Sequence, residues 1–448
     1  MSTYPELPRL QRAEPFALPI RVLQFGQGNF LRGFVDWQLE LLNKRCDLDF
    51  GVVIVRPTSR SKAPLLDTQG GRYTTVLRGL DAEGVLQTEV TRINCVQREL
   101  DLSVHFSDYL ALARNPDVRF VVSNTTEAGI AVNASDSFAD QPPESFPAKL
   151  TRWLFERCAH FQADPAKGVV LLPTELIEAN GPALQSAVRH YVGLWKLDSE
   201  FQSWLDNSCH FCSTLVDRIV TGYPVDEIVQ LQAELGYQDD FLVTGELYHY
   251  WAIEAPPWVA QELPLDRAGL NVQWVKDLAP IRLRKVAILN GAHTVLAAVG
   301  LLAGVRTVGE AMQDPDICGF LEAVLHEEII PALPFPEVDS QAYAQDVLRR
   351  FRNPHIQHQL QAIALNMESK CIARLLPQIQ SFYRTSGRFP TRLLLALAAA
   401  VQGLEGKSAQ LDCAVAATSG FAEALLEART RIESKGIRSV LPGVQARL

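Results

Sequence analysis

The sequence lacks the features that mark membrane proteins and secreted proteins. Its longest uninterrupted apolar run, from Leu393 to Val401, has nine residues, far below the roughly 20 that cross a bilayer as a helix. The first residues, Met-Ser-Thr-Tyr-Pro-Glu-Leu-Pro, are polar and contain no apolar core of a secretion signal. We therefore expect a cytoplasmic protein without a membrane partner.

Cysteine is also scarce, with eight residues in a chain of 448, as in proteins that keep their thiols reduced. Only Cys209 and Cys212 have the CxxC spacing, and no second ligand pair follows as a zinc site would require. The motifs of zinc proteases, serine hydrolases and P-loop nucleotidases are missing, and no tyrosine has a lysine four residues later. We expect packed, inert thiols and no metal site.

Charge of one sign is nowhere concentrated. The chain has 51 acidic and 42 basic residues, a formal net charge of −9, and the acidic residues are scattered. This balance argues against a nucleic acid or an anionic membrane surface as partner. It is compatible with an anionic small molecule, because two local cations are enough to bind one. The oligomeric state does not follow from the sequence.

The length of the chain predicts more than one domain. With 448 residues, of which 47% are hydrophobic, the chain is too long for one ordinary core. The change from mixed patterns to long helical patterns near residue 280 suggests the boundary. We expect an N-terminal arm over residues 1–18, an α/β domain over 19–278 and a mainly helical domain over 279–448, with a cleft between the two domains.

Four short runs of apolar, mostly β-branched residues alternate with helical segments in the first part of the chain, namely Val22–Phe25, Gly51–Val55, Phe120–Ser123 and Val169–Leu172. This alternation predicts a Rossmann-like, doubly wound and mostly parallel sheet. An antiparallel hairpin of Tyr73–Arg78 and Val85–Ile93 is expected within it. The later part shows helical spacing over residues 285–304, 308–332, 340–351, 355–377, 390–404 and 414–435.

A glycine turn follows the first predicted strand, in Ile20-Arg-Val-Leu-Gln-Phe-Gly26-Gln-Gly28-Asn-Phe30. In a dinucleotide-binding fold such a turn lets the backbone approach a pyrophosphate, and the next helix points its free N–H groups at the charge. Gly26 is expected to make the tight turn and Gly28 to allow the close approach. The order strand, glycine turn, amphipathic helix therefore predicts a dinucleotide site.

The acidic residue that commonly binds the ribose of NAD is missing from the end of the second strand. That strand ends in Val55-Arg56-Pro-Thr-Ser-Arg60, and Asp47 and Asp49 precede it. Arg56 and Arg60 are instead suited to a 2′-phosphate. The residues alone therefore leave NAD and NADP both open.

The segment Lys285-Val-Ala-Ile-Leu-Asn290-Gly-Ala-His293 places an amine, a carboxamide and an imidazole within nine residues. These groups are able to take a proton from a secondary alcohol, hold the developing oxyanion and orient the hydroxyl group. A lysine with its ordinary pKa of ~10.4 is a poor base at neutral pH, but burial lowers that pKa. Asn290 and His293 share one helical face, and Lys285 joins them most easily if the helix begins after it.

The chain resembles the long-chain mannitol dehydrogenase family, whose hallmark Lys-x4-Asn-x2-His is matched by Lys285, Asn290 and His293. It resembles still more closely the altronate oxidoreductase (tagaturonate reductase) branch of that family. The similarity runs from about residue 19 to about residue 404. The matching strings are Gln24-Phe-Gly-Gln-Gly-Asn-Phe-Leu-Arg-Gly-Phe-Val-Asp-Trp37, Ser123-Asn-Thr-Thr-Glu-Ala-Gly-Ile130, Pro147-Ala-Lys-Leu-Thr-Arg152, Phe211-Cys-Ser-Thr-Leu-Val-Asp-Arg-Ile-Val-Thr-Gly-Tyr-Pro224, Arg284-Lys-Val-Ala-Ile-Leu-Asn-Gly-Ala-His-Thr294 and Arg350-Phe-Arg-Asn-Pro354.

The resemblance implies metal-independent transfer of hydride to or from C4 of a nicotinamide, with NAD as the expected cofactor. It implies that Lys285 is the general base for oxidation and the general acid for reduction, that Asn290 stabilises the oxyanion, and that His293 positions the substrate oxygen. Asp217 and Lys370 match positions that contact the polyol. The residues expected to bind the cofactor are Phe25, Gly26, Gln27, Gly28, Asn29, Phe30, Arg56, Asn124 and Thr125.

Three positions depart from the pattern of the polyol dehydrogenases. Leu176 replaces an oxyanion-binding asparagine, Ala362 replaces an arginine that binds polyol hydroxyls, and Arg282 replaces a carboxylate. These changes argue against mannitol as the substrate, and the added positive charge suits a substrate carboxylate. Arg282, Arg352 and Lys370 are the candidates for binding it.

With these motifs, the resemblance implies an NAD-dependent oxidoreductase that interconverts the keto-uronate D-tagaturonate and the aldonate D-altronate in hexuronate breakdown. A fructuronate reductase, or a mannitol or other polyol dehydrogenase of the same family, is the alternative enzyme. A non-catalytic NAD(H)-binding sensor is a third reading. The intact Lys285, Asn290 and His293 speak against it, because a sensor needs no base.

Overall fold

The computed structural model of the chain describes residues 7–11, 17–56, 64–125, 129–404, 410–411, 415 and 419–442. The chain forms two compact units. The first contains Met1–Arg78 and Thr88–Leu278, and the second contains Gly79–Gln87 and Ala279–Leu448.

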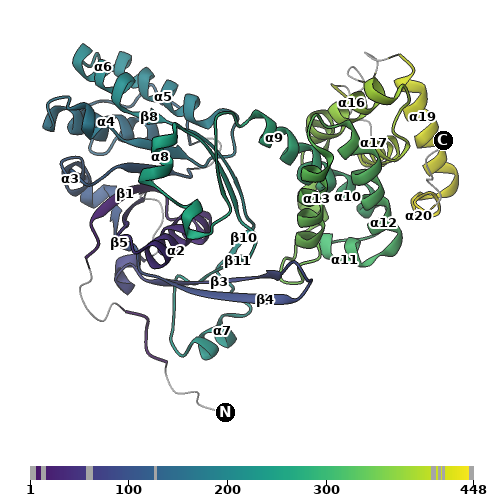
Figure 1. Ribbon diagram of the computed structural model, residues 1–448, viewed down its shortest axis with the longest axis horizontal. Coiled ribbons are helices and arrows are strands. Elements are labelled where there is room, and N and C mark those ends of the chain that lie inside the picture. The colour runs from purple at the N-terminus through teal and green to yellow at the C-terminus, as the bar shows by residue number, and fades with distance from the viewer. Residues whose placement is uncertain are drawn as a thin grey trace. The chain divides into compact units, whose positions relative to one another are not determined.

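A six-stranded sheet forms the centre of the first unit (Figure 1). Its order is β5-β2-β1-β6-β7-β8, and every neighbouring pair is parallel. The direction of winding changes between β1 and β6, which is the arrangement of a Rossmann-like, doubly wound sheet and confirms the predicted fold class. The strands are β1 (Ile20–Phe25), β2 (Gly51–Arg56), β5 (Val96–Asp101), β6 (Phe120–Ser123), β7 (Val170–Pro173) and β8 (His210–Phe211).

Both faces of this sheet are buried, because alternate residues of each strand point to opposite sides. Val22 and Ile54 belong to one hydrophobic cluster, together with Phe34 of the helix that follows the glycine turn. Leu23 and Val53 belong to the other. The helices of this unit are α1 (Asn29–Leu31), η1 (Arg32–Asp36) and α2 (Trp37–Cys46), which are continuous, followed by α3 (Leu102–Leu112), α4 (Phe146–His160), α5 (Asn180–Leu194), α6 (Ser199–Ser208), α7 (Ile228–Leu235) and α8 (Pro257–Glu262).

Two smaller sheets complete the strands. One has the order β10-β11-β3-β4 and the other β13-β12-β9. The predicted hairpin is present, since β3 and β4 are neighbours in their sheet and the N–H of Asp81 donates to the carbonyl of Val85, 3.0 Å away. The strands are β3 (Tyr73–Leu80), β4 (Leu86–Ile93), β9 (Ser213–Asp217), β10 (Val220–Gly222), β11 (Val243–Glu246), β12 (Tyr250–Glu254) and β13 (Val272–Val275).

Residues 7–11 of the N-terminal arm are held by hydrogen bonds to Gln238. The N–H of Leu10 donates to the carbonyl of Gln238 at 2.8 Å, and the Leu10 residue is only 5% exposed. The carbonyl of Pro8 accepts a hydrogen bond from the N–H of Gln238 at 2.9 Å. Leu10 supplies the apolar contact that fixes this segment.

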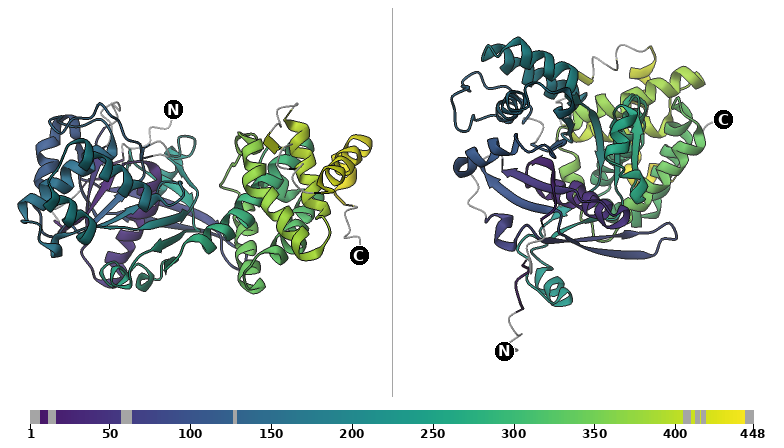
Figure 2. Two further views of the ribbon diagram at one scale, coloured as in Figure 1. Left: turned by 90° about the horizontal axis from the view of Figure 1, so that it is seen from above. Right: turned by 60° about the vertical axis from the view of Figure 1, so that its left-hand side comes forward.

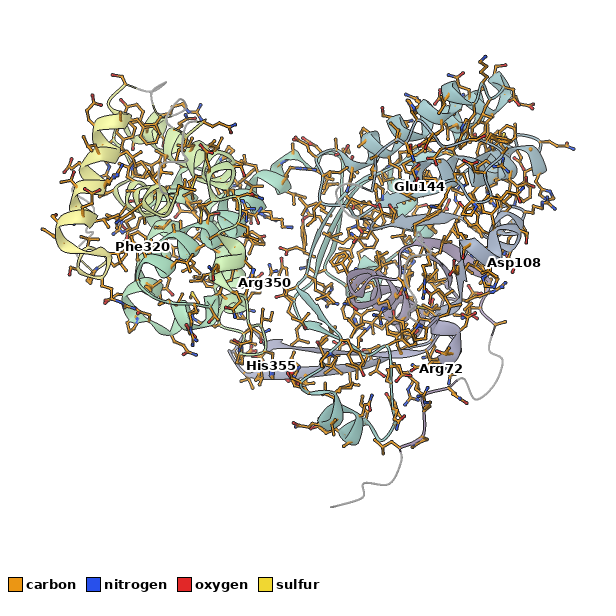
Figure 3. All side chains as sticks on the ribbon, turned by 180° about the vertical axis from the view of Figure 1, so that it is seen from behind. Arg72, Asp108, Glu144, Phe320, Arg350 and His355 are labelled. Carbon is orange, nitrogen blue, oxygen red and sulfur yellow. The ribbon has the colours of Figure 1, made fainter. Side chains whose placement is uncertain are left out.

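The second unit is mainly helical from Ala279 on, as both views of Figure 2 show. Phe320, labelled in Figure 3, is one of the aromatic residues that fill its interior and is 4% exposed. The helices are α9 (Ala279–Lys285), η5 (Val286–Asn290), α10 (Gly291–Leu302), α11 (Val308–Gln313), α12 (Pro315–Ala323), η6 (Val324–Ile329), η7 (Ile330–Ala332), α13 (Glu337–Phe351), α14 (Leu360–Ile363), α15 (Met367–Lys370), η8 (Cys371–Leu375), α16 (Leu376–Ser386), α17 (Thr391–Gly403), α19 (Phe421–Lys435) and α20 (Ile437–Val440).

The long helix from Ala279 to Leu302 is the central element of this unit. By length and composition it is apolar enough to cross a membrane, but 67% of its most apolar window is buried inside the protein. Its last segment, α10, packs against α12, α14 and α17. Packing among these helices therefore accounts for its composition.

The prediction of one continuous helix over residues 355–377 is wrong. The chain is irregular from Arg352 to Gln359, and Asn366 has a left-handed backbone with a φ of 56° that separates α14 from α15. Helical spacing of apolar residues did not reveal this break, because asparagine is one of the few residues that adopt the left-handed region at small cost.

Candidate active site

The glycine turn between β1 and α1 has two glycines in different surroundings. Gly26 is buried, with a φ of +117°, and a Cβ added there would lie 3.1 Å from the carbonyl oxygen of Asn124. Gly28 is exposed, and a Cβ added there would meet nothing within 4 Å. The structure therefore requires glycine at position 26 for the turn itself, whereas the space at Gly28 is open to a ligand.

The helix that begins at Asn29 has no side-chain hydrogen bond at its N-cap residue, Gly28. The N–H groups of its first turn are thus not satisfied by a capping side chain. Such a helix end binds anions, and the open space at Gly28 lies directly before it. These residues fit the pyrophosphate of a dinucleotide.

Asn124 and Thr125 lie at the carboxyl ends of the strands, next to Gly26. Asn124 donates from Nδ2 to the carbonyl of Thr174 at 3.1 Å, and its own N–H donates to the carbonyl of Phe25 at 3.2 Å. The crevice at this edge, where the winding changes direction, is the place at which doubly wound sheets bind nucleotides. The structure therefore brings Gly26, Asn124 and Thr125 together.

Glu175, which the sequence interpretation missed, organises the same edge. Its Oε1 accepts hydrogen bonds from the N–H and the hydroxyl of Thr125, both at 3.0 Å. Burial raises the pKa of the Glu175 carboxyl, and its hydrogen bonds, including one from Ser123, oppose that shift. The available signal was its position three residues after the predicted strand Val169–Leu172, at the edge of the sheet where a nucleotide is expected to bind.

The side chains of the turn are engaged by the protein. Phe25 is fully buried and packs against Phe146, with ring centroids 4.8 Å apart, so its side chain supports the turn from the core and does not face a ligand. Asn29 accepts a hydrogen bond from Arg32 at 2.7 Å. Phe30 stacks on Phe34 with ring centroids 5.0 Å apart. A nucleotide would therefore meet the backbone of these residues.

Arg56, the candidate for a 2′-phosphate, is held inside the protein. Its guanidinium lies 3.0 Å from the carboxylate of Glu99, and the two side chains are 4% and 0% exposed. The amide of Gln27, oriented with its nitrogen toward Glu99, donates to the same carboxylate at 2.9 Å. The charge of Arg56 is thus neutralised by Glu99, and the other candidate, Arg60, lies outside the described residues.

Lys285, Asn290 and His293 are half-buried, whereas Ala287 to Leu289, Gly291 and Ala292 between them are buried. We call these three residues, which the sequence predicts to be catalytic, the catalytic row. The helix predicted over residues 285–304 begins earlier, at Ala279, so Lys285 lies within it. A π-helical turn follows Lys285, in which the N–H of Gly291 donates to the carbonyl of Val286, five residues back. A turn of this length places Lys285 and Asn290 on one face, as residues four apart lie in an α-helix.

The aromatic side chains around His293 come from later in the chain. The His293 ring lies 4.4 Å from the ring of Phe351 and 4.9 Å from that of His358, measured between centroids. Burial, and then the charge of Lys370, lower the pKa of His358. Neither Phe351 nor His358 was singled out from the sequence, although Phe351 lies in the string Arg350-Phe-Arg-Asn-Pro354. Figure 3 labels Arg350 on α13 and His355 in the following loop.

The candidate substrate-binding residues are in different environments. Lys370 donates from Nζ to the carbonyl of Ile363 at 2.7 Å, and Arg282 is half-buried on α9. Arg352 is exposed, and its Nη2 lies 2.7 Å from Glu322 Oε1. These three belong to the second unit. Asp217 ends strand β9 of the first unit and is 7% exposed.

Cys209 and Cys212 are buried, and burial raises the pKa of each thiol to about 12. Thiols in this state are poor nucleophiles and poor metal ligands. Within the described part of the chain, no group of three or more His, Cys, Asp or Glu side chains is arranged to hold a metal ion.

Comparison with known proteins gives consistent matches. Residues 20–267 match the family model of the mannitol dehydrogenase Rossmann domain, and residues 277–441 match that of the mannitol dehydrogenase C-terminal domain. The altronate oxidoreductase of Yersinia enterocolitica serotype O:8 is 52% identical over 389 residues, which cover 87% of this chain and 80% of that relative. The altronate oxidoreductase of Cronobacter sakazakii is 51% identical over 398 residues, covering 89% and 82%.

Solved structures with the same fold cover nearly the whole chain. D-sorbitol dehydrogenase in its substrate-free form has a TM-score of 0.80 at 21% identity, over 97% of this chain and 98% of that one. Pseudomonas fluorescens mannitol 2-dehydrogenase, in a ternary complex with NAD and D-mannitol, has a TM-score of 0.70 at 21% identity, covering 99% and 98%. At this identity the likeness concerns the fold.

Proposed function

The chain belongs to the mannitol dehydrogenase family and is an oxidoreductase that acts on a secondary alcohol, and on this premise we propose that it interconverts D-tagaturonate and D-altronate with NAD. The observation that carries the proposal is the half-buried catalytic row, whose helix is otherwise buried from Ala287 to Ala292. Identity above 50% to relatives named altronate oxidoreductase supports the choice of substrate.

The chemistry follows from the groups in the row. A bound nicotinamide nucleotide supplies the hydride in reduction and accepts it in oxidation. In oxidation, Lys285 Nζ takes the proton of the substrate hydroxyl group, and in reduction it returns a proton to that oxygen. The amide of Asn290 donates a hydrogen bond to the same oxygen as negative charge develops on it. The imidazole of His293 orients this oxygen.

We propose NAD, and not NADP, as the cofactor. The guanidinium of Arg56 is neutralised by Glu99 at 3.0 Å and is 4% exposed, which leaves it unsuited to a 2′-phosphate. The solved mannitol 2-dehydrogenase with this fold was obtained as a complex with NAD.

A division of labour between the two parts of the chain belongs to the same proposal. Residues 19–278 carry the glycine turn and bind the nucleotide, while residues 279–448 carry the catalytic row and bind most of the substrate. The seven described cysteines are free thiols, which agrees with a cytoplasmic location, and the small-molecule substrate calls for no nucleic-acid or membrane partner.

A substrate panel tests the proposal. The purified protein is given D-tagaturonate, D-fructuronate or D-fructose with NADH or NADPH, and loss of NADH absorbance is followed. We expect the highest kcat/KM with D-tagaturonate and NADH. Reduction of fructose without reduction of tagaturonate would show a polyol dehydrogenase instead. Binding of NADH without turnover of any substrate would show a sensor.

A further inference from the structure

A group of basic side chains lies beside the catalytic row in the second unit. Arg374, on η8, donates from Nη1 to the hydroxyl of Thr294 at 3.3 Å, and Thr294 directly follows His293. His358 contacts the ring of His293. Lys370 lies close enough to His358 to lower its pKa, and Arg374 does the same to Lys370. A ring contact and electrostatic interactions thus relate His293, His358, Lys370 and Arg374, and the hydrogen bond from Arg374 to Thr294 fixes this group beside the catalytic row.

Two members of this cluster, Lys370 and Arg374, are cations whose surroundings disfavour their charge. Burial, and then the charge of Arg374, lower the pKa of Lys370, and burial lowers the pKa of Arg374. Among the described residues, no carboxylate forms an ion pair with either of them; Lys370 Nζ instead donates to the carbonyl of Ile363. The contrast is Arg352, whose guanidinium is paired with Glu322 at 2.7 Å.

Two neighbouring cations that are half-buried and lack an acidic partner repel each other, which disfavours the charged form of each. An anion placed between them removes this repulsion and replaces part of the lost hydration. A carboxylate is the best-suited small anion, because arginine binds its two oxygens through parallel N–H groups while a lysine adds a third donor. The polyols of the wider family carry no such group, whereas a keto-uronate carries one.

We propose that Arg374 and Lys370 together bind the carboxylate of the keto-uronate or aldonate substrate. This inference rests on the proposed function and names the residues that select an acidic sugar over a neutral one. Arg374 was not among the cations considered from the sequence. Arg352, which was considered, is already paired with Glu322. The lowered pKa of His358 favours its neutral form, so its ring adds no further positive charge beside these two cations.

The first experiment compares D-tagaturonate with D-tagatose, the neutral ketose that lacks the carboxylate. For Arg374→Gln and Lys370→Gln we expect the KM for tagaturonate to rise about 10- to 100-fold, the loss typical of a hydrogen bond to a charged group. In both variants kcat/KM should fall much further for tagaturonate than for tagatose, and the ratio of the two values measures recognition of the carboxylate. Arg374→Lys should recover part of the loss. The matched control is Arg429→Gln, an exposed arginine of the same unit that is paired with Glu433.

The second experiment measures binding without turnover. Calorimetry with NADH-saturated protein compares D-altronate, which NADH cannot oxidise, with the neutral D-altritol. We expect the wild type to favour altronate, and Arg374→Gln to lose at least about tenfold of that preference. Equal preference in wild type and Arg374→Gln, or loss of preference in Arg352→Gln instead, overturns the assignment.

The two experiments separate this inference from the proposed function. If the wild type fails to reduce tagaturonate, the proposed reaction is wrong, and the binding comparison still decides whether Arg374 and Lys370 recognise a carboxylate. Circular dichroism and NADH binding verify that each variant is folded, and Arg374→Lys provides a second test if Arg374→Gln is not.

Discussion

The carboxamide of Gln24 and the carboxyl group of Asp36 lie against each other inside the first unit, with Gln24 Nε2 3.4 Å from Asp36 Oδ2. Both residues are fully buried, and in the described part of the chain Gln24 Oε1 and Asp36 Oδ1 have no hydrogen-bond partner. A proton on Asp36 Oδ1 would let the acid and the amide share two hydrogen bonds. Gln24 Nε2 also donates to the carbonyl of Gly26 at 3.2 Å, so this pair supports the glycine turn.

This pair predicts a dependence of stability on pH. Burial raises the pKa of Asp36 to about 7 from its ordinary value of 3.8, although a hydrogen bond from Tyr73 and the charge of Arg32 oppose the shift; Glu40 adds to it. Because the folded chain keeps a proton that the unfolded chain loses, this contribution is full below about pH 4 and is lost as the pH rises to about 7. The total loss is about 4 kcal/mol.

Urea denaturation of the wild type and Asp36→Asn across this pH range measures the effect. The asparagine does not titrate, so we expect a flatter dependence of the free energy of unfolding on pH. Glu328, whose pKa burial also raises to about 7, titrates in both proteins, so their difference isolates Asp36. Parallel curves for the two proteins would mean that Asp36 is ionised in the folded state.

The two glycines of the turn are expected to respond differently to alanine. Gly26→Ala forces a side chain into a φ of +117° and against the carbonyl of Asn124, so we expect about 1–3 kcal/mol of destabilisation and loss of NADH binding. Gly28→Ala meets no protein atom, so the melting temperature should stay unchanged while NADH affinity falls at least about tenfold through contact with the pyrophosphate. Unchanged NADH affinity in Gly28→Ala contradicts the assigned binding mode.

Replacement of the proposed proton carrier separates chemistry from cofactor binding. For Lys285→Met we expect turnover to fall by several orders of magnitude, because the group proposed to exchange a proton with that oxygen is removed. NADH binding, followed by fluorescence, should persist. Lys435→Met on the exposed end of α19 is the matched control and should retain full activity. Substantial turnover by Lys285→Met would assign the proton transfer to another residue.

The buried ion pair of Arg56 and Glu99 is expected to affect both the free energy of unfolding and the preference for NADH over NADPH. Arg56→Gln leaves Glu99 buried without its cation, and we expect about 3 kcal/mol of destabilisation in urea denaturation. The wild type should use NADH in preference to NADPH, measured as kcat/KM. A stable Arg56→Gln variant that has selectively lost activity with NADPH would instead identify Arg56 as a phosphate ligand.

Much of the central sheet could be predicted, because β1, β2, β6 and β7 are continuous buried runs whose pattern needs no partner to be recognised. Strands β10 and β11 could not. Their residues include Thr and Gly, and β11 pairs in parallel with β3, about 170 residues earlier in the chain. Pairing at that separation leaves no local pattern.

The candidate site was predictable in its residue types and only partly in its geometry. The spacing of Asn290 and His293 indicated a shared face, but regular helical geometry turned Lys285 away from it. The π-helical turn brings Lys285 back to the face of Asn290. It depends on one hydrogen bond that spans five residues in place of four, and the spacing of apolar residues does not reveal such a bond. The neutralisation of Arg56 was equally hidden, because its partner Glu99 lies on another strand.

The π-helical turn at Val286–Asn290 makes the catalytic row equivalent to residues one, five and eight of an uninterrupted α-helix. The turn contains one residue more than an α-helical turn, and this extra residue leaves the orientation of α10 relative to Lys285 unchanged. Deleting one residue between Lys285 and Asn290 should therefore regularise the backbone and keep the three groups aligned. Deleting two should swing the lysine by about 100° toward the packed side. At this point the number of residues matters more than their identity.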